Sequence, residues 1–203
     1  GLRRIAEHGV EFQSHIDGTT RTLTPERAID IQWQLGADIA MAFDHVVPGQ
    51  SSAEAACEGM ERTLRWLDRC KASHERLAAG LQGSGAGEQR QHTGAFPFDG
   101  SPALRPSGPA AHQTLWPIIQ GGIHDELRLR SLEGTLEQGP WTGIAIGGLS
   151  VGEPKPVMHR ILERLGPVLP VEIPRYLMGV GFPADLLEGI ARGIDLFDCV
   201  AAT

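Results

Sequence analysis

The sequence predicts an α/β protein built on a parallel β-sheet covered by helices. Three observations predict it: apolar runs of strand length alternate with amphipathic helical stretches, the runs are almost continuously apolar, and each run ends in a polar or glycine cluster. Nearly continuous apolar strands are typical of parallel sheets with both faces covered. Polar clusters after many successive strands favour a (β/α)8 barrel of the TIM type, with its active face at the strands' carboxyl ends, over an open doubly wound sheet.

Five apolar runs are predicted as strands: Ala37–Asp44, Leu115–Gly121, Gly143–Leu149, Arg175–Gly181 and Ile194–Val200. The shorter segment Val10–Ile16 is also strand-like and adds a sixth candidate. A closed barrel needs eight strand–helix units, and only five or six are visible in this sequence. We therefore predict that residues 1–203 form one partial, incomplete TIM-barrel catalytic domain.

Helical periodicity fits five segments: Pro25–Leu35, Ser52–Leu77, His124–Gln138, Pro156–Leu165 and Pro183–Arg192. In the longest of them, apolar residues recur at steps of three and four and give one face to bury. Thr24 before Pro25 is typical of an N-cap followed by a proline in the first helical turn.

Residues 80–114 interrupt this alternation. Seven Gly and four Pro fall in these 35 positions, and apolar residues are scattered among them. Such a composition cannot bury enough apolar surface to offset the entropy of the chain. We expect a flexible surface insertion at this place.

The overall composition excludes several classes of protein. Hydrophobic residues make up 41% of the chain and charged residues 21%, which is typical of a globular protein. No apolar run approaches the roughly 18 residues of a membrane helix, and no secretion signal is visible, so a soluble cytoplasmic protein is expected. The net charge of -7 means that any contact with nucleic acid must come from a local patch.

The cysteine residues predict no metal site within this chain. Cys57, Cys70 and Cys199 are far apart and show no C-x-x-C spacing. None of the eight histidines lies in an H-E-x-x-H arrangement. Neither a disulfide framework nor a self-contained zinc site is therefore expected.

Two aspartates follow strongly apolar runs. Asp44 comes after Ile39–Phe43 and Asp198 after Ile194–Phe197, which places each carboxylate at a strand end. A partly desolvated, rigidly held carboxylate suits a nucleophile or a recognition group. For either Asp alone, capping of the following helix explains the residue equally well. Two such Asp, with Gln120 at a third strand end, favour a shared site.

Glycines supply the second part of the pattern. Gly147, Gly148, Gly179 and Gly181 remove side chains where two strands meet the expected pocket, so that a flat ligand can lie against the backbone. An Asp accepts hydrogen bonds from a guanine-like N–H edge, and a Gln donates to a carbonyl oxygen. Met178 can pack on the face of such a ring, although a core position explains a Met as well. The residues alone leave the ligand open.

These motifs, in their order along the chain, resemble the tRNA-guanine transglycosylases, the queuine tRNA-ribosyltransferase family. The matching stretches are S-H-I-D-G (14–18), the segment from Leu23 through Asp44, R-W-L-D-R-C (65–70), I-I-Q-G-G (118–122), G-G-L-S-V-G-E (147–153), Y-L-M-G-V-G (176–181) and G-I-D-L-F-D-C-V (193–200). The likeness covers the chain apart from the 80–114 segment. The resemblance implies a (β/α)8 barrel and a pentosyltransferase of queuosine biosynthesis, which exchanges guanine at the tRNA wobble position for a 7-deazaguanine.

The resemblance implies a role for each strand-end residue. Asp198 corresponds to the nucleophile that attacks the ribose anomeric carbon and forms a covalent ribosyl intermediate. Asp44 and Gln120 correspond to the groups that recognise the edge of the base. The leaving group is guanine, whose departure hydrogen bonds in the pocket can stabilise.

The resemblance also places further residues around the base. The backbone of Gly148 and Leu149 would assist its recognition, and Met178 would help to sandwich the ring. Gly179 belongs to the same substrate-binding set, and Glu153 would lie by the pocket.

The resemblance leaves the choice between preQ1 and queuine open, and two valines bear on it. Val46 follows the eukaryote-like form of the family, whereas Val151 follows the bacterial form, where queuine users tend to have Gly. A bulky Val151 would narrow the pocket and favour the smaller preQ1.

The sequence also departs from the family pattern. A D-S-G-G-F-Q-like segment, which supplies the family's general acid/base Asp, is not found. The family's zinc-binding Cys/Cys/Cys/His part lies downstream of F-D-C-V, so Zn²⁺ is expected in full-length members and its ligands are not expected in this chain. A non-catalytic truncated or accessory subunit is the alternative, and a related activity on DNA or another tRNA position stays open. The implied partners are the tRNA anticodon loop, the small base, and a second subunit in a homodimer or heterodimer.

Overall fold

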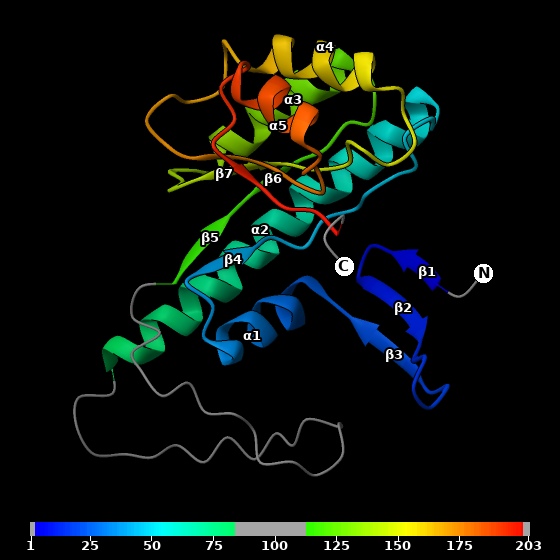
Figure 1. The fold of residues 1–203 in the computed structure, drawn as a ribbon. Coiled ribbons are helices and arrows are strands. Elements are labelled where there is room, and N and C mark those ends of the chain that lie inside the picture. Colours follow the sequence, from blue (N-terminus) through cyan, green and yellow to red (C-terminus); the bar gives the residue numbers. More distant parts are fainter. Residues whose placement is uncertain (1–2, 84–112, 201–203) are drawn as a thin grey trace.

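A computed structural model describes residues 3–83 and 113–200 (Figure 1). Its parallel strands follow one another in chain order, each joined to the next by hydrogen bonds or by continuity of the chain. These strands are β4 (Ile39–Met41), β5 (Thr114–Trp116), β6 (Ile118–Ile119), β7 (Ile144–Ile146), β8 (Arg175–Leu177) and β9 (Leu196–Phe197). The mixed α/β class with a parallel sheet is therefore confirmed.

Pro117 divides one long strand into β5 and β6. Proline has no N–H to donate, so the ladder is interrupted at this residue and two short strands are formed. The backbone nevertheless stays in register on both sides: Trp116 O accepts from the Ala42 N–H at 2.9 Å, and Pro117 O accepts from the Ala145 N–H at 2.9 Å. The pairs β4–β5 and β6–β7–β8–β9 are thereby linked into one run of parallel strands.

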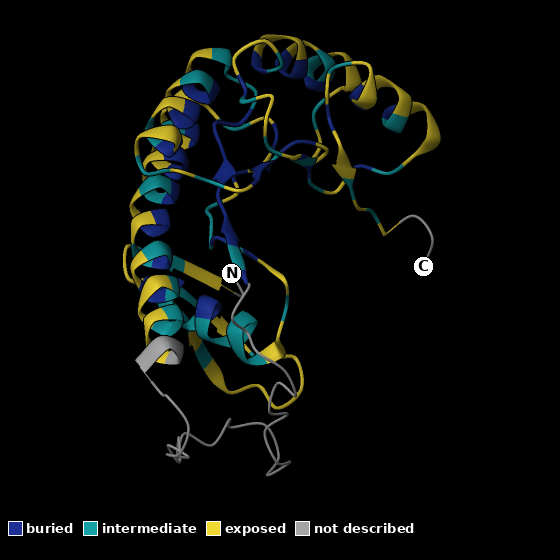
Figure 2. Cartoon of the chain, turned by 90° about the vertical axis from the view of Figure 1, so that its left-hand side faces the viewer, coloured by how far each residue is buried: buried dark blue, intermediate teal, exposed yellow. Residues whose placement is uncertain are grey.

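Helices alternate with these strands and lie on the outside of the arc that the strands form (Figure 2). They are α1 (Pro25–Leu35), α2 (Ala53–Gly83), α3 (Asp125–Glu137), α4 (Lys155–Leu165) and α5 (Pro183–Ile190). Every predicted helix is present, and α1 has the predicted bounds. Thr24 is its N-cap, since the hydroxyl accepts from the Arg27 N–H at 3.2 Å. Among the described helices, none is long and apolar enough to cross a membrane.

The segment Val10–Ile16 does not supply a further unit of the parallel sheet. Its first residues belong to β2 (Gly9–Gln13), the middle strand of a separate antiparallel sheet with β1 (Arg3–Ala6) and β3 (Thr20–Leu23). The physical reason is the length of the connections. Only two residues join β1 to β2, and so short a connection joins antiparallel strands, whereas parallel neighbours need a crossover of a dozen or more residues. The expectation of a sixth barrel unit at this place was wrong.

Arginine side chains of α2 hold this antiparallel sheet in place. Arg65 donates two hydrogen bonds to the Glu7 carboxylate, each of 2.8 Å, and holds the pKa of that carboxyl at about 2. Trp66 and Arg69 both donate to the Glu7 carbonyl at 2.8 Å, and Arg69 also pairs with Glu26. The turn between β1 and β2 is thereby attached to the helix.

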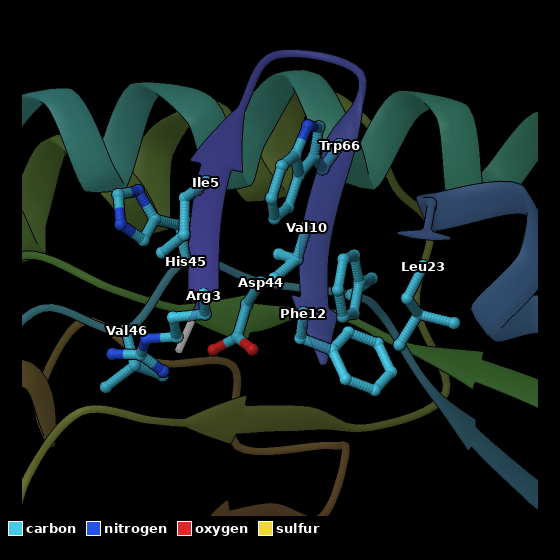
Figure 3. A pocket seen from close by; sticks show the side chains of 10 residues that line it. Arg3, Ile5, Val10, Phe12, Leu23, Asp44, His45, Val46 and Trp66 are labelled. Carbon is cyan, nitrogen blue, oxygen red and sulfur yellow. The ribbon is translucent and has the colours of Figure 1, made fainter. Parts of the chain in front are cut away.

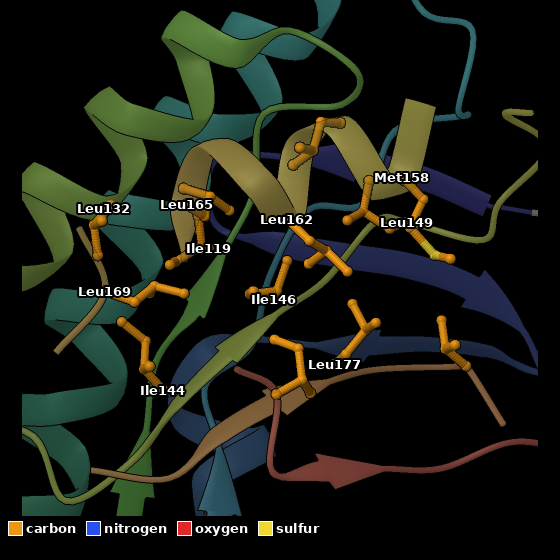
Figure 4. Close-up of a cluster of buried hydrophobic side chains, with 13 residues drawn as sticks. Ile119, Leu132, Ile144, Ile146, Leu149, Met158, Leu162, Leu165, Leu169 and Leu177 are labelled. Atoms are coloured by element: carbon orange, nitrogen blue, oxygen red, sulfur yellow. The ribbon is translucent and has the colours of Figure 1, made fainter. Parts of the chain in front are cut away.

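The main core lies between the β6–β9 sheet and its helices (Figure 4). Ile146 and Leu177 of the sheet and Leu162 of α4 are all 1% exposed or less. A smaller cluster packs α1 and α2 against β4 and β5. Each part of the parallel sheet is thus packed against its helices by its own apolar cluster.

The predicted insertion is bounded by regular structure. Helix α2 continues to Gly83, beyond the predicted end at Leu77, and β5 begins at Thr114. Both ends of the 80–114 segment therefore belong to a helix or a strand. Residues 84–112 lie outside the described residues.

Truncation of a core leucine should destabilise the protein far more than truncation of an exposed one. Leu162 is 1% exposed, and Leu35, also helical, is 71% exposed. We expect Leu162→Ala to lower the free energy of unfolding by about 2–5 kcal/mol, because it leaves a cavity. Leu35→Ala should change it by less than about 0.5 kcal/mol. Urea unfolding measures both variants, and equal effects would contradict the described packing.

Candidate active site

Asp44 and Gln120 meet at the carboxyl ends of β4 and β6. Gln120 Nε2 donates to Asp44 Oδ2 at 2.6 Å. The Gln120 backbone is fixed in turn, because its N–H donates to the Ser131 hydroxyl of α3 at 3.1 Å. The side chain is 1% exposed, and among the described residues its Oε1 has no hydrogen-bond partner. Two of the predicted base-recognition residues are therefore in direct contact.

The Asp44 carboxylate faces a cavity of about 220 Å³ beneath the antiparallel sheet (Figure 3). Apolar side chains of that sheet, including Ile5, Val10 and Phe12, line it together with Trp66. Burial raises the pKa of the Asp44 carboxyl above its ordinary value, and the hydrogen bond from Gln120 offsets part of that rise. The sheet therefore contributes to the electrostatics of a predicted site residue.

Gln120 occupies the space in which side chains at positions 147 and 148 would lie, so only glycine fits at either position. A Cβ at Gly147 would lie 2.6 Å from Gln120 Nε2, and one at Gly148 would lie 2.3 Å from Gln120 Oε1. Gly148 also has a φ of +65°, which disfavours any L side chain. A Cβ at Gly147 would be 3.5 Å from Asp44 Oδ2. These glycines therefore adjoin the Asp44–Gln120 pair.

Arg128 of α3 is a site residue that the sequence analysis missed. Its side chain is fully buried and donates to four backbone carbonyls, at 2.9 Å to Ile119 O and Gly122 O, 2.7 Å to Gly147 O and 3.2 Å to Gly148 O. Burial lowers the pKa of its guanidinium to about 10, so the group stays charged at neutral pH. The signal available in the sequence was weak: Arg128 lies four residues before Leu132, on the same face of the helix.

Asp198 forms a second group with residues of β8. Tyr176 Oη and the Gly179 N–H both donate to Asp198 Oδ1 at 2.7 Å. Gly179 has a φ of +75° and open space where a Cβ would be. The Asp198 side chain is exposed, and Met178 next to Gly179 is half-buried.

Tyr176 was also missed by the sequence analysis. Burial, and then the neighbouring Asp198, raise the pKa of its hydroxyl to about 12, so it stays a hydrogen-bond donor at neutral pH. The signal available was its spacing, since residues 176 and 178 share one face of a strand. Tyr176 therefore helps to orient the predicted nucleophile.

The loop after β7 is organised by Glu153. Its carboxylate accepts from the backbone N–H groups of Ser150 and Val151, the second at 3.0 Å. Leu149 is 2% exposed and belongs to the core, so only its backbone can meet a ligand. Val151 is 41% exposed. The loop lies against the loop after β4, since Gln50 Nε2 donates to Gly152 O at 3.4 Å.

All predicted site residues lie at or beyond the carboxyl ends of the parallel strands, and five of them form two separate groups. Asp44, Gln120 and Gly148 form the first group, and Gly179 and Asp198 form the second. No hydrogen bond joins the two groups within the part of the chain that the structure describes. The convergence of Asp44 and Asp198 on one ligand stays a prediction.

The described residues do not fit a zinc site. No group of three or more His, Cys, Asp or Glu side chains in residues 3–83 and 113–200 is placed to hold a metal ion. Cys70 is buried, and burial raises the pKa of its thiol to about 12, which opposes the thiolate form that zinc requires.

A family model described as queuine tRNA-ribosyltransferase matches residues 1–203. The chain belongs to this family. A queuine tRNA-ribosyltransferase of Desulforamulus reducens is 44% identical over 202 residues, and one of Azotobacter vinelandii is 45% identical over 202 residues. Each match covers 100% of this chain and 45% of the relative, so the chain spans a little under half of these family members.

Replacement of Asp44 by Asn should stabilise this family member more at neutral than at acidic pH. The folded-state pKa of Asp44 is raised above the 3.8 of the unfolded chain, so the folded protein holds this proton more tightly. Asp44 therefore contributes stability below pH 3.8 that is lost as pH rises through the folded-state pKa. Asn keeps an acceptor for Gln120 and carries no charge to desolvate.

Urea unfolding between pH 4 and pH 8 measures this effect. The gain in unfolding free energy of Asp44→Asn over the unmodified protein should grow with pH. Asp38→Asn, at the opposite end of β4, is the control for loss of one exposed charge. A gain of the same size at every pH would show that Asp44 is not desolvated.

Proposed function

We propose that this chain is the base-binding and nucleophile-bearing part of a tRNA-guanine transglycosylase, which exchanges guanine at the wobble position of tRNA for a 7-deazaguanine. The observation that carries the proposal is the Asp44–Gln120 pair beside a glycine backbone, in a chain of this family. A carboxylate that accepts and an amide that donates match the N–H and carbonyl edge of a guanine. One N–H of Gln120 holds Asp44, which leaves the other for the base.

Asp198 is suited to attack the ribose. Tyr176 and Gly179 hold Oδ1, and Oδ2 takes no hydrogen bond from any described residue. In the proposed step Oδ2 attacks the anomeric carbon, and the bond from that carbon to guanine N9 breaks. Guanine leaves with the electron pair and takes up a proton. The incoming base then displaces the carboxylate and loses its N9 proton, and two inversions retain the configuration.

The fold supports a barrel completed by residues outside this chain. Strands β4 to β9 follow one another in chain order, run parallel, and have helices on their outer side. Successive neighbours of this kind are typical of consecutive units of a (β/α)8 barrel. In such a barrel the sheet curves, and the ends of β4 and β9 approach the same pocket.

A non-catalytic accessory subunit is the second candidate. The observation that favours it is the surroundings of Asp198, where the hydrogen-bonded partners are Tyr176 and Gly179 and no second carboxyl group is among them. The tRNA anticodon loop, a second subunit and a cytoplasmic location stay predictions under both candidates.

Replacement of Asp198 by Asn should abolish exchange. We expect incorporation of labelled guanine into tRNA by the whole gene product to fall on the order of 10³-fold or more, because an amide cannot form the covalent intermediate. A covalent tRNA adduct on denaturing gels should disappear with it. Asp195→Asn is the matched control, because Asn keeps the acceptor for the Arg175 N–H. Full exchange by Asp198→Asn would refute the assignment, and no exchange by the unmodified protein would favour the accessory subunit.

The unmodified protein should incorporate preQ1 in preference to queuine. Val151 is 41% exposed on the loop that adjoins the proposed pocket, where its side chain can obstruct a large substituent. Val151→Gly should shift the ratio of the two kcat/KM values toward queuine by about tenfold. Competition between the two bases measures this ratio. A queuine preference of the unmodified protein would contradict the role of Val151.

A further inference from the structure

Arg128 is a buried cation that forms no hydrogen bond with any described carboxylate, and the charge of Glu153 acts on it only electrostatically. It is 0% exposed, and no ion pair among the described residues includes it. Its partners are backbone carbonyls at the ends of two adjacent strands, Ile119 and Gly122 after β6 and Gly147 and Gly148 after β7. A charge is costly to bury, so this arrangement points to a specific task for the carbonyls that it holds.

The carbonyl contacts fix the direction of two backbone N–H groups. In a planar trans peptide, the N–H points opposite to the carbonyl of the same unit. Arg128 draws the carbonyls of Gly147 and Gly148 to itself, so the N–H groups of Gly148 and Leu149 point away from it. Within the described residues neither N–H has an acceptor. The positive φ of Gly148 allows two successive peptides to take this orientation.

These two N–H groups adjoin the proposed base site. Gln120 lies against both glycines, and Asp44 lies near Gly147, as the short distances from their hypothetical Cβ atoms show. A carbonyl oxygen of a purine bound beside Gln120 would therefore lie next to these two peptides. A rotated Gly147–Gly148 or Gly148–Leu149 peptide would instead present a carbonyl, which repels that oxygen.

We propose that Arg128 is a positioning residue for base recognition, which turns the Gly148 and Leu149 N–H groups toward the carbonyl oxygen of the bound purine. This inference rests on the proposed function. Arg128 does not touch the base and acts through the two peptides. A lysine cannot replace it, because three donors on one nitrogen cannot reach four carbonyls that a planar fork with five N–H groups spans.

The test compares Arg128→Lys with Arg130→Lys in the whole gene product. Arg130 lies on the same helix, but its side chain is 56% exposed and pairs with Glu61 at the surface. Equilibrium dialysis with guanine and a gel-shift assay with tRNA measure the two ligands separately. We expect Arg128→Lys to raise the dissociation constant for guanine at least tenfold and to change tRNA affinity less than twofold. Arg130→Lys should change neither.

A spectroscopic measurement tests the peptide orientation without any ligand. In protein labelled with ¹⁵N-glycine and ¹⁵N-leucine, the amide signals of Gly148 and Leu149 should shift in Arg128→Lys and stay in place in Arg130→Lys. If the unmodified protein binds no guanine, the proposed function fails. The amide signals then still show whether Arg128 orients the two peptides.

Several results would overturn the inference. Unchanged amide signals or an unchanged guanine dissociation constant in Arg128→Lys would each do so. Equal losses of guanine and tRNA affinity in a folded Arg128→Lys would show a general scaffold role instead. If circular dichroism shows that Arg128→Lys is unfolded, Arg128→Ala with millimolar guanidinium takes its place. Recovery of guanine binding then supports the inference, and failure to recover it overturns the inference.

Discussion

A backbone carbonyl that leaves a sheet but stays buried must find a donor, and at the ends of β6 and β7 a single guanidinium supplies it. Arg128 connects α3 to both strand ends through four such carbonyls. The segments that carry Gln120 and Gly148 are therefore fixed relative to each other. Hydrogen bonds to four carbonyl dipoles, together with the electrostatic attraction of Glu153, explain why a charge is tolerated in the core. The first group of site residues depends on this contact.

The electrostatics of Asp44 connect that group to the N-terminal sheet. Apolar side chains of β1 and β2 desolvate the carboxylate, and Gln120 stabilises it with one hydrogen bond. The sheet itself is attached to α2 largely by arginines that hold Glu7 and the turn beside it. The ion pairs of Glu7 thus hold in place the sheet that covers the half-buried Asp44 carboxylate. Sites of this kind commonly give up some stability for their chemistry.

Much of this arrangement follows from the sequence. Apolar periodicity predicted the helices and the parallel strands, and strand-end reasoning predicted that Asp44 and Gln120 share a site. The antiparallel sheet was missed because an apolar alternation such as that of Val10–Ile16 does not reveal which strands will be its neighbours. Arg128 was missed because it shares the buried face of α3 with Ser131 and Thr135, so that apolar periodicity does not mark this face, and its role is evident only once the carbonyls around it are placed. The sequence does not give the distance between the carboxylates of Asp44 and Asp198. Their convergence on one ligand therefore stays a prediction.

The direction of α2 has a consequence for how the protein can change. The helix begins at Ala53, beside the strand ends that carry the site, and its 31 residues carry the chain about 46 Å away. The chain returns at Thr114, the amino end of β5. Insertions or deletions between Gly83 and Thr114 therefore lie at the end of the sheet opposite the proposed site. Selection can therefore lengthen, shorten or replace that stretch, and an experimenter can graft a tag there, without moving the residues that would hold a base.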